Sequence, residues 1–232
     1  MNDYKVLITT SGTGSRLGEL TKAVNKALVT VGEKTVIEHI VDAYSKETRF
    51  VVTIGYYGEQ VRNFLMAAYP DRTFEFIEVD KYTGDGSSLG YSMLCAKDAL
   101  QCPFIFHCND TLVEGEIPPP TKNWIGTYED GDVVQYTSWK VTSDGKLLFQ
   151  AKGAVDFDYI HIGLIGVCEY AAYWRILEEL YAENSADQSL NDCKVLVRML
   201  VEGRRFSIQN FATWYDTGNL AALEAARQAL TK

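Results

Sequence analysis

The sequence predicts an α/β fold with a doubly wound, mixed but mostly parallel sheet and helices on both faces. Two observations support this prediction. Short apolar runs alternate with segments of helical periodicity through the first half of the chain, as βα units do. After Pro118-Pro119-Pro120 the pattern changes to strands joined by turn residues, which predicts an inserted antiparallel β region. The 232 residues can bury a sizeable core.

The first half is predicted as strands that alternate with helices. Strands are expected at Lys5–Thr9, Phe50–Ile54, Phe74–Val79 and Pro103–Cys108, and helices at Thr35–Glu47, Gly58–Ala68 and Ser87–Leu100. In the first of these helices, apolar residues recur with a helical period, and Ser87 or Ser88 is a candidate N-cap of the third. Strands separated by helices pair in parallel, so the expected sheet is Rossmann-like.

The second half is predicted to add the antiparallel strands. Asp144-Gly145 is a hairpin turn signal between two strand-like segments. Strands are expected at Asp132–Val141, Lys146–Gln150, Ile160–Cys168 and Phe206–Phe211, and helices at Tyr170–Glu183, Leu190–Glu202 and Leu220–Leu230. No internal repeat interrupts this order.

Composition excludes several classes of protein. The formal net charge is −9 and no run of Lys and Arg exceeds two residues, which argues against a nucleic-acid partner. The five cysteines are odd in number and lack a C-x-x-C pair, so free thiols in a reducing cytosol are expected. No stretch has the length of a membrane span and residues 1–10 do not resemble a signal peptide. We expect a cytoplasmic protein with no membrane partner.

The segment TTSGTGSRLGELTKAVNKAL, residues 9–28, carries the first functional signal. Gly12 and Gly14 follow a buried strand, and Arg16 and Lys26 follow the glycines. Leu17 rules out G-x-G-x-x-G, and no Walker A loop is present. Backbone N–H groups in such a turn can hold phosphate, and the two cations suit an anionic ligand. A surface loop with two solvated cations is the alternative.

The same segment resembles sugar-phosphate nucleotidylyltransferases, in which a strand, G-x-G-[ST]-R-L and a Lys-Ala-Leu or Lys-Pro-Leu step follow one another. Further segments resemble the family's motifs in the family's order. They are ALVTVGEKTVIEHIVDAY, VVTIGYYGEQVRNFL, GDGSSLGYSMLCAKDAL, FIFHCNDTL, YIHIGLIGV and WYDTGNLAALEAA. Each motif is weak alone, whereas six in order along nearly the whole chain form a specific pattern.

The resemblance implies a reaction and a domain organisation. A nucleoside triphosphate and a sugar 1-phosphate would give a nucleoside-diphosphate sugar and pyrophosphate, for surface polysaccharide or glycoconjugate synthesis. Residues 1–232 would form a single nucleotidyltransferase domain, with a nucleotide-binding half at 1–117 and an acceptor-binding and C-terminal part at 118–232. The chain would be a short stand-alone enzyme, and its oligomeric state is left open.

The resemblance also implies roles for individual residues. Arg16 and Lys26 would be catalytic, balancing phosphate charge. Asp110 and Asp216 would hold Mg²⁺. The nucleotide would contact Thr10, Ser11, Gly12, Thr13, Gly14, Ser15, Arg16, Lys26, Ser87 and Ser88, and the acceptor would contact Lys152, His161 and Gly163. Simpler roles are an Asx turn for Asp110, a helix cap near Asp216, N-caps for the two serines and a solvated charge for Lys152.

Two departures from the family pattern bear on specificity. Ala151 stands where members that use hexose phosphates have Glu, and Asn109 stands where the family usually has Gly. The second half is also rich in aromatic residues that could box a quaternary ammonium, namely Trp139, Tyr159, Tyr136 and Trp174. A cytidylyltransferase acting on phosphocholine or a polyol phosphate is therefore the first alternative. A non-catalytic nucleotide- or sugar-phosphate-binding protein is the second.

Overall fold

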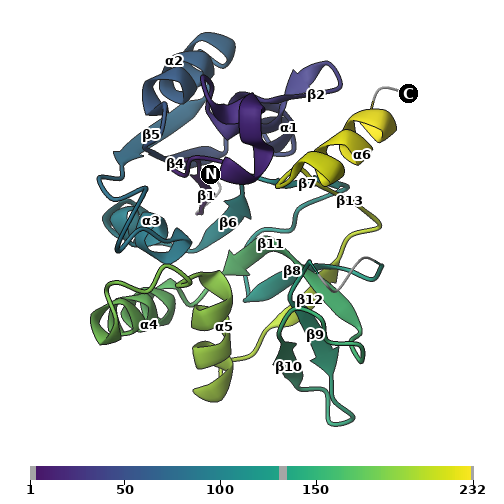
Figure 1. The fold of residues 1–232 in the computed structure, drawn as a ribbon. Coiled ribbons are helices and arrows are strands. Elements are labelled where there is room, and N and C mark those ends of the chain that lie inside the picture. The colour runs from purple at the N-terminus through teal and green to yellow at the C-terminus, as the bar shows by residue number, and fades with distance from the viewer. Residues whose placement is uncertain (1–3, 131–134, 231–232) are drawn as a thin grey trace.

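A single mixed sheet organises the computed structural model, which describes residues 4–130 and 135–230 (Figure 1). The described residues form a nine-stranded sheet in which β10-β9-β11-β6-β1-β4-β5 are neighbours and β8 and β12 branch from β11. The strands are β1 (Lys5–Thr9), β4 (Arg49–Ile54), β5 (Thr73–Glu78), β6 (Phe104–Cys108), β8 (Trp124–Tyr128), β9 (Ser138–Val141), β10 (Leu147–Gln150), β11 (Tyr159–Val167) and β12 (Ser207–Asn210). The predicted α/β class is confirmed.

Helices cover both faces of this sheet. Val6 and Ile8 of β1 point into one apolar core and Leu7 into the other, because successive side chains of a strand alternate between faces. The first core contains residues of α1 (Val36–Asp42), α2 (Gly58–Ala68) and α6 (Leu220–Leu230). The second contains residues of α3 (Leu89–Cys95), α4 (Tyr170–Glu183) and α5 (Asp192–Val201). Two cores on one sheet make the central strands rigid supports for whatever follows them.

The strand order creates a switch point between β1 and β6. Strands β6, β1, β4 and β5 are parallel neighbours, and the chain runs outward through β4 and β5 before it returns to the other side of β1. Thr9 and Cys108, the last residues of β1 and β6, are directly paired. In open α/β sheets a ligand crevice lies at this kind of reversal, outside the carboxyl ends of the strands.

Antiparallel strands join the second half of the chain to this parallel core. β11 pairs with β6, with β8 and with β9, so it connects the two parts of the sheet. A separate two-stranded ladder pairs β7 (Thr111–Glu114) with β13 (Thr213–Asp216), and Asp216 lies opposite Thr111. The chain following β6 is thereby held against the chain that leads into the last helix.

The sequence prediction missed β7, β8 and β13, as well as the short hairpin of β2 (Thr30–Val31) and β3 (Lys34–Thr35). These strands have two to five residues and no extended apolar run, so periodicity does not reveal them. The predicted strand Asp132–Val141 is observed only as β9, and its residues 132–134 lie outside the described residues.

Two predicted helices are much shorter than expected, and a third, expected at Leu190–Glu202, spans Asp192–Val201. The helix expected at Thr35–Glu47 spans Val36–Asp42; Thr35 and Glu38 form a capping box at its start. The helix expected at Ser87–Leu100 ends at Cys95 and continues as a separate 3₁₀ turn, η3 (Lys97–Leu100). Among the described residues no helix has the length and apolarity to cross a bilayer. All five cysteines are free thiols.

We predict that Gly166→Ala destabilises the junction between β11 and β8. A Cβ at Gly166 would lie 2.1 Å from Nε1 of Trp124, a side chain that is only 1% exposed and cannot easily move away. Overpacking of this kind costs about 1–3 kcal/mol. The free energy of unfolding from urea titration measures the effect. Gly12→Ala is the control, because nothing lies within 4 Å of a Cβ there; equal stability of the two variants would contradict the prediction.

Candidate active site

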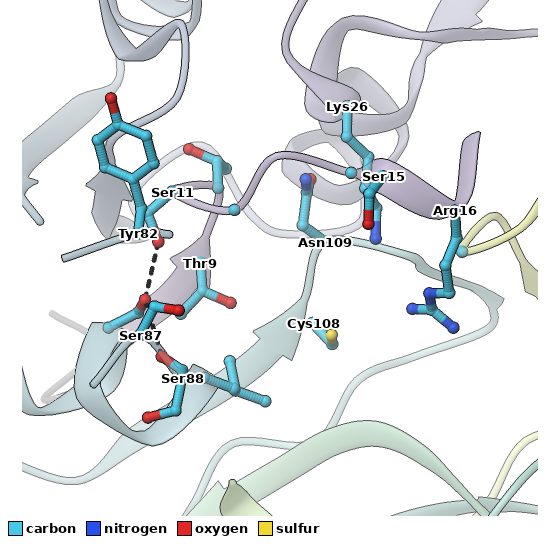
Figure 2. Close-up of a pocket in the computed structure, with 16 residues that line it drawn as sticks. Thr9, Ser11, Ser15, Arg16, Lys26, Tyr82, Ser87, Ser88, Cys108 and Asn109 are labelled. Carbon is cyan, nitrogen blue, oxygen red and sulfur yellow. Dashed lines mark hydrogen bonds between the residues drawn. The ribbon is translucent and has the colours of Figure 1, made fainter. Parts of the chain in front are cut away.

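A cavity of about 320 Å³ opens at the switch point between β1 and β6 (Figure 2). Its wall combines the ends of these strands, the glycine-rich loop after β1, the start of α3 and the chain before α6. The lining residues are Thr9, Thr10, Ser11, Gly12, Gly14, Ser15, Arg16, Lys26, Tyr82, Ser87, Ser88, Leu89, Ser92, Cys108, Asn109 and Gly218. Of the ten residues predicted to contact a nucleotide, Thr13 alone is outside this lining.

The glycine-rich loop folds back onto Lys26. Gly14 has φ of 65°, in the left-handed region, and a Cβ there would lie 2.9 Å from Cβ of Lys26. The loop continues into the 3₁₀ turn η1 (Ser15–Thr21), where Leu17 N–H donates to the Gly14 carbonyl. Arg16, on the first turn of η1, has a 65% exposed side chain. The tight turn thus brings two cations to one end of the cavity.

Asn25 fixes the end of this loop, a role that sequence reasoning missed. Its side chain is completely buried, and Nδ2 donates to the carbonyls of Thr10 (2.8 Å) and Tyr56 (2.6 Å). Its Oδ1 accepts from the N–H of Ala27 (2.9 Å) and so caps η2 (Lys26–Leu28). The amide therefore ties the end of β1 to the residue before Lys26. The available signal in the sequence was an Asn just before the Lys-Ala-Leu step.

Asp110 and Asp216, the two predicted metal ligands, are not among the lining residues, but Asp110 lies directly beside the two cations that are. Its Oδ2 is 2.6 Å from Nζ of Lys26 and 3.5 Å from Nη2 of Arg16. Burial alone would raise the pKa of this carboxyl. This effect is outweighed by three groups that stabilise the ionised form, namely Lys26, the Cys108 thiol and Arg16, and the pKa of Asp110 falls to about 2. Asp110 is therefore an ionised carboxylate over the whole neutral range.

Asp216 is the second carboxylate of the site. Oδ2 of Asp110 and Oδ1 of Asp216 are each 2.9 Å from the position that a Cβ on Gly218 would occupy. A side chain there would fill the space between them, so glycine keeps that space open. Tyr136 O–H (2.7 Å) and Gly218 N–H (2.7 Å) donate to Asp216. Burial and the nearby charge of Asp110 nevertheless raise the pKa of Asp216.

Buried hydrogen bonds hold the turn that carries Asp110. His107 lies between Tyr44 O–H, 2.8 Å from Nδ1, and the carbonyl of Thr111, 2.8 Å from Nε2. Burial lowers the pKa of His107 to about 4, so the ring is neutral; we assign the proton to Nε2, which donates to Thr111. Thr217 N–H also donates to the carbonyl of Asp110 (2.9 Å). These bonds fix the backbone on both sides of Asp110.

The opposite end of the cavity is lined by hydroxyl groups. Ser11 and Ser92 hydrogen bond to each other through their side chains (2.8 Å). Ser88 is the N-cap of α3, since its Oγ accepts from Tyr91 N–H (2.9 Å), and Ser87 Oγ donates to the carbonyl of Gly84. Figure 2 shows Ser11, Ser87, Ser88 and Tyr82 on one side and Lys26 and Arg16 on the other. The cavity is therefore neutral and polar at one end and cationic at the other.

The three residues predicted to contact an acceptor do not come together in this cavity. Lys152 lies on an exposed turn between β10 and β11. His161 is buried, with Nε2 2.8 Å from Asp192 Oδ2 and with Nδ1 3.3 Å from the indole Nε1 of Trp139. Gly163 has φ of 71°, and a Cβ there would lie 2.8 Å from that of Cys108, which does line the cavity.

The aromatic residues singled out in the second half have separate environments. Trp139 is fully buried and packs edge-on against Phe149, whereas Trp174 stacks on Phe104 in the same apolar core. Tyr136 instead packs against Trp214 and hydrogen bonds to Asp216. Two of the four rings are thus core residues.

Comparison with known proteins gives related sequences. No protein-family model matches the chain. A probable glucose-1-phosphate cytidylyltransferase of Bacillus subtilis (strain 168) is 28% identical over 135 residues, 55% of this chain and 50% of that protein. The bifunctional protein GlmU of Methanococcus vannielii is 20% identical over 223 residues, 91% of this chain and 51% of that protein. The chain spans about half the length of these curated relatives.

Solved structures of similar fold cover nearly the whole chain. A candidate glucose-1-phosphate thymidylyltransferase of Bacillus anthracis superposes with a TM-score of 0.80 at 16% identity, over 99% of this chain and 96% of that one. The inositol-1-phosphate CTP transferase of T. maritima gives 0.74 at 17% identity, over 98% and 94%. The CTP:phosphocholine cytidylyltransferase of Streptococcus pneumoniae gives 0.75 at 18%, over 98% and 99%. The predicted resemblance to nucleotidylyltransferases is confirmed, and these structures share the fold.

We predict that Asp216→Asn stabilises the metal-free protein at pH 7. Because the pKa of Asp216 is higher in the folded state than in the unfolded chain, ionisation of this carboxyl opposes folding. The penalty is complete above the folded pKa and vanishes below the unfolded pKa of about 3.9. Urea titrations at pH 7 and pH 3 measure the gain and its loss. Asp71→Asn, at an exposed position, is the control; a less stable Asp216→Asn protein at pH 7 would contradict the prediction.

Proposed function

We propose that this chain is a nucleotidyltransferase that joins a nucleoside triphosphate to a sugar 1-phosphate, giving a nucleoside-diphosphate sugar and pyrophosphate. The observation that carries the proposal is the placement of Arg16 and Lys26 beside Asp110 and Asp216 at the switch point of the sheet. The names of the relatives and of the structures with this fold support it.

The cavity suits a nucleotide in one orientation. The triphosphate would lie at the cationic end, with the backbone of the glycine-rich loop and Arg16, whose planar guanidinium can fork across two phosphate oxygens. Lys26 would add a compact positive charge. The base and ribose would lie toward Ser11, Ser87 and Ser88, where hydroxyl groups line the wall. A surface loop with two solvated cations, the alternative for this segment, would need none of this convergence.

The two carboxylates fit a hard divalent cation, and we propose Mg²⁺. Asp110 and Asp216 supply oxygen ligands of the kind that Mg²⁺ prefers, on either side of a space that only a glycine at 218 leaves open. The depressed pKa of Asp110 keeps one ligand ionised. When bound, Mg²⁺ would neutralise negative charge on phosphate oxygens.

The chemistry requires positioning and charge balance more than covalent catalysis. A phosphate oxygen of the acceptor attacks the α-phosphorus, the bond from that phosphorus to the β-phosphate bridge breaks, and pyrophosphate leaves with the electron pair. Arg16 and Lys26 would stabilise the charge that builds on the leaving group and on the α-phosphate. Each group of this kind is worth on the order of 10²–10³-fold in rate. Preorganisation comes from Asn25 and from the turn of Gly14.

The proposal for the acceptor-binding site is supported by fewer contacts than the proposal for the nucleotide site. We propose that Lys152 reaches the acceptor phosphate from its exposed turn and that Gly163 and His161 lie on the acceptor side of Cys108. We also propose a cytoplasmic enzyme that supplies surface polysaccharide or glycoconjugate synthesis. The residues 1–117 would serve the nucleotide and 118–232 the acceptor.

A second candidate is a cytidylyltransferase for a phosphate that is not a sugar. Ala151 favours it, since no carboxylate stands there to hold sugar hydroxyls. Structures of the same fold include proteins named for inositol 1-phosphate and for phosphocholine. A non-catalytic binding protein is the third possibility. It fits less well, because such a protein has no need of both carboxylates beside two cations.

Pyrophosphate release distinguishes these functions. The assay combines Mg²⁺ and each of ATP, CTP, GTP, UTP and dTTP with several sugar 1-phosphates, inositol 1-phosphate, phosphocholine and glycerol phosphate. Release with a sugar 1-phosphate supports the first function, and release only with CTP and a non-sugar phosphate supports the second. Nucleotide binding without release from any pair would favour the binding protein.

We predict that Asp110→Ala lowers pyrophosphate release by at least about 10²-fold, the scale of one lost electrostatic group at a transition state. The fold should persist, because Asp110 lies on a turn whose backbone is held by Thr217 and His107. Circular dichroism and a melting curve check the fold. Asp71→Ala is the matched exposed control and should retain full activity. Full activity of Asp110→Ala would disprove the metal assignment.

A further inference from the structure

The segment 22–25, which leads into Lys26, belongs to no helix or strand, so its backbone groups need partners from elsewhere in the chain. Gln60, on the first turn of α2, supplies two of them. Its Nε2 donates to the carbonyl of Ala23 (3.0 Å), and its Oε1 accepts from the N–H of Asn25 (3.1 Å). One side-chain amide thus pairs with the backbone on both sides of the intervening residue, as a neighbouring strand would.

Two tyrosines that precede Gln60 hold the same part of the chain. Tyr56 O–H donates to the carbonyl of Thr21 (3.0 Å), and Tyr57 O–H donates to that of Lys22 (2.9 Å). Among the described residues, Tyr57 is the one non-glycine residue with a positive φ, 50°. Aromatic residues rarely adopt this region, and such strain persists only where surrounding contacts impose it, commonly near functional sites. The turn that presents Gln60 is therefore held against backbone strain.

The same turn also contacts the start of the glycine-rich loop. Tyr56 N–H donates to the carbonyl of Ser11 (2.9 Å). At the far end of the loop, Asn25 Nδ2 donates to the carbonyl of Tyr56 (2.6 Å). Residues 55–60 therefore close the glycine-rich loop at both ends, and Lys26 comes directly after the second closure.

The placement of Lys26 depends on this closure. Nζ of Lys26 lies 2.6 Å from Oδ2 of Asp110, and the lysine side chain is only 15% exposed. Such a contact requires a fixed backbone at position 26, and the preceding Asn25 is bound both by Gln60 and by the carbonyl of Thr10. Gln60 is not among the residues that line the cavity. It can therefore influence a ligand there only through the loop that it holds.

We propose that Gln60 is a positioning residue for Lys26: by pairing with the backbone of Ala23 and Asn25, it fixes the cation where phosphate charge develops. The inference rests on the proposed function, since it requires a triphosphate at the cationic end of the cavity. Glutamine suits this role because its amide offers a donor and an acceptor together, whereas an ionised glutamate offers only acceptors. In a capping box the third helical residue bonds the N-cap N–H; Gln60 has that position but bonds the loop instead.

The kinetics of pyrophosphate release by Gln60→Met test the proposal. Methionine keeps the length of the side chain and removes both hydrogen bonds. We expect kcat to fall about tenfold, because a displaced catalytic group loses much of its effect. The KM for the triphosphate should stay within about threefold, since the lost interaction belongs to the transition state. Gln60→Ala removes the same two bonds and is the second variant should methionine not be accommodated; melting curves check both.

A double-mutant cycle separates positioning from a general structural effect. In a Lys26→Met background, Gln60→Met should lower kcat by less than about twofold, because the group that Gln60 positions is already gone. Gln101→Met is the matched control. It loses an amide-to-backbone bond of the same kind, from Nε2 to the carbonyl of Lys97 (2.7 Å), and should retain the kcat of the wild type.

Hydrogen exchange gives a second measurement that needs no turnover. In Gln60→Met the N–H of Asn25 loses its acceptor, so amides of residues 22–28 should exchange at least about tenfold faster than in the wild type. Amides of the buried strand β6 should keep their rate, which would show that the loop is loosened and not the whole fold.

The outcomes also separate this inference from the proposed function. Unchanged exchange over residues 22–28, or an equal loss of kcat with and without Lys26, overturns the positioning role and leaves the function standing. A Gln60→Met variant that only raises KM would equally overturn it, because Gln60 would then support binding alone. A wild type that neither binds a triphosphate nor releases pyrophosphate would reject the function and the inference together.

Discussion

The site depends on holding two carboxylates of like charge next to each other in a partly buried place. Asp110 and Asp216 repel each other, and burial together with the charge of Asp110 raises the pKa of Asp216. What keeps them in place is the backbone. The ladder of β7 and β13 sets Asp216 opposite Thr111, and Thr217 N–H donates to the carbonyl of Asp110. Backbone pairing therefore holds Asp216 beside Asp110 although burial and the charge of Asp110 disfavour the ionised form of Asp216.

The cations compensate for one of the two charges, and their placement follows from the loop after β1. Lys26 contacts Asp110 because Asn25 anchors the preceding residue and Gly14 turns the chain back onto it. A loop held by one amide and one left-handed glycine is rigid where it meets the carboxylate, while Arg16 on η1 remains exposed. The cavity thus has a fixed cation and a more accessible one, both at the end where phosphate charge is expected.

Much of the fold could be predicted from the sequence, because short continuous runs of apolar residues indicate strands that are buried on both faces. The parallel core β1, β4, β5 and β6 and the helices around it follow from that signal. Strands β7 and β13 could not be predicted, since strands of four residues are too short to show a period and their pairing joins distant parts of the chain. They are nevertheless the elements that bring the two carboxylates together.

The residues of the candidate site likewise fall into those that the sequence predicts and those that it does not. Residues that end a strand or lie in the glycine-rich loop could be predicted from the sequence to lie together, because the carboxyl ends of parallel strands meet at one edge of the sheet. Asn25 could not, since its role is to bond backbone carbonyls of Thr10 and Tyr56 that only the folded chain brings near it. His161 was assigned by resemblance alone, and its buried partner Asp192 lies on α5, outside any local motif. Its role in acceptor binding stays a prediction.

The pairing of β13 with β7 also has a consequence for the order in which a nascent chain matures. The ribosome delivers Lys26 and Asp110 long before Asp216, so the cation can meet the first carboxylate while the second is still unmade. Electrostatic repulsion enters only when the final strand docks beside β7. Nucleation can thus proceed through the apolar parallel core, and the unfavourable charge arrangement is deferred to the last stage of assembly, when the surrounding structure already exists to resist it.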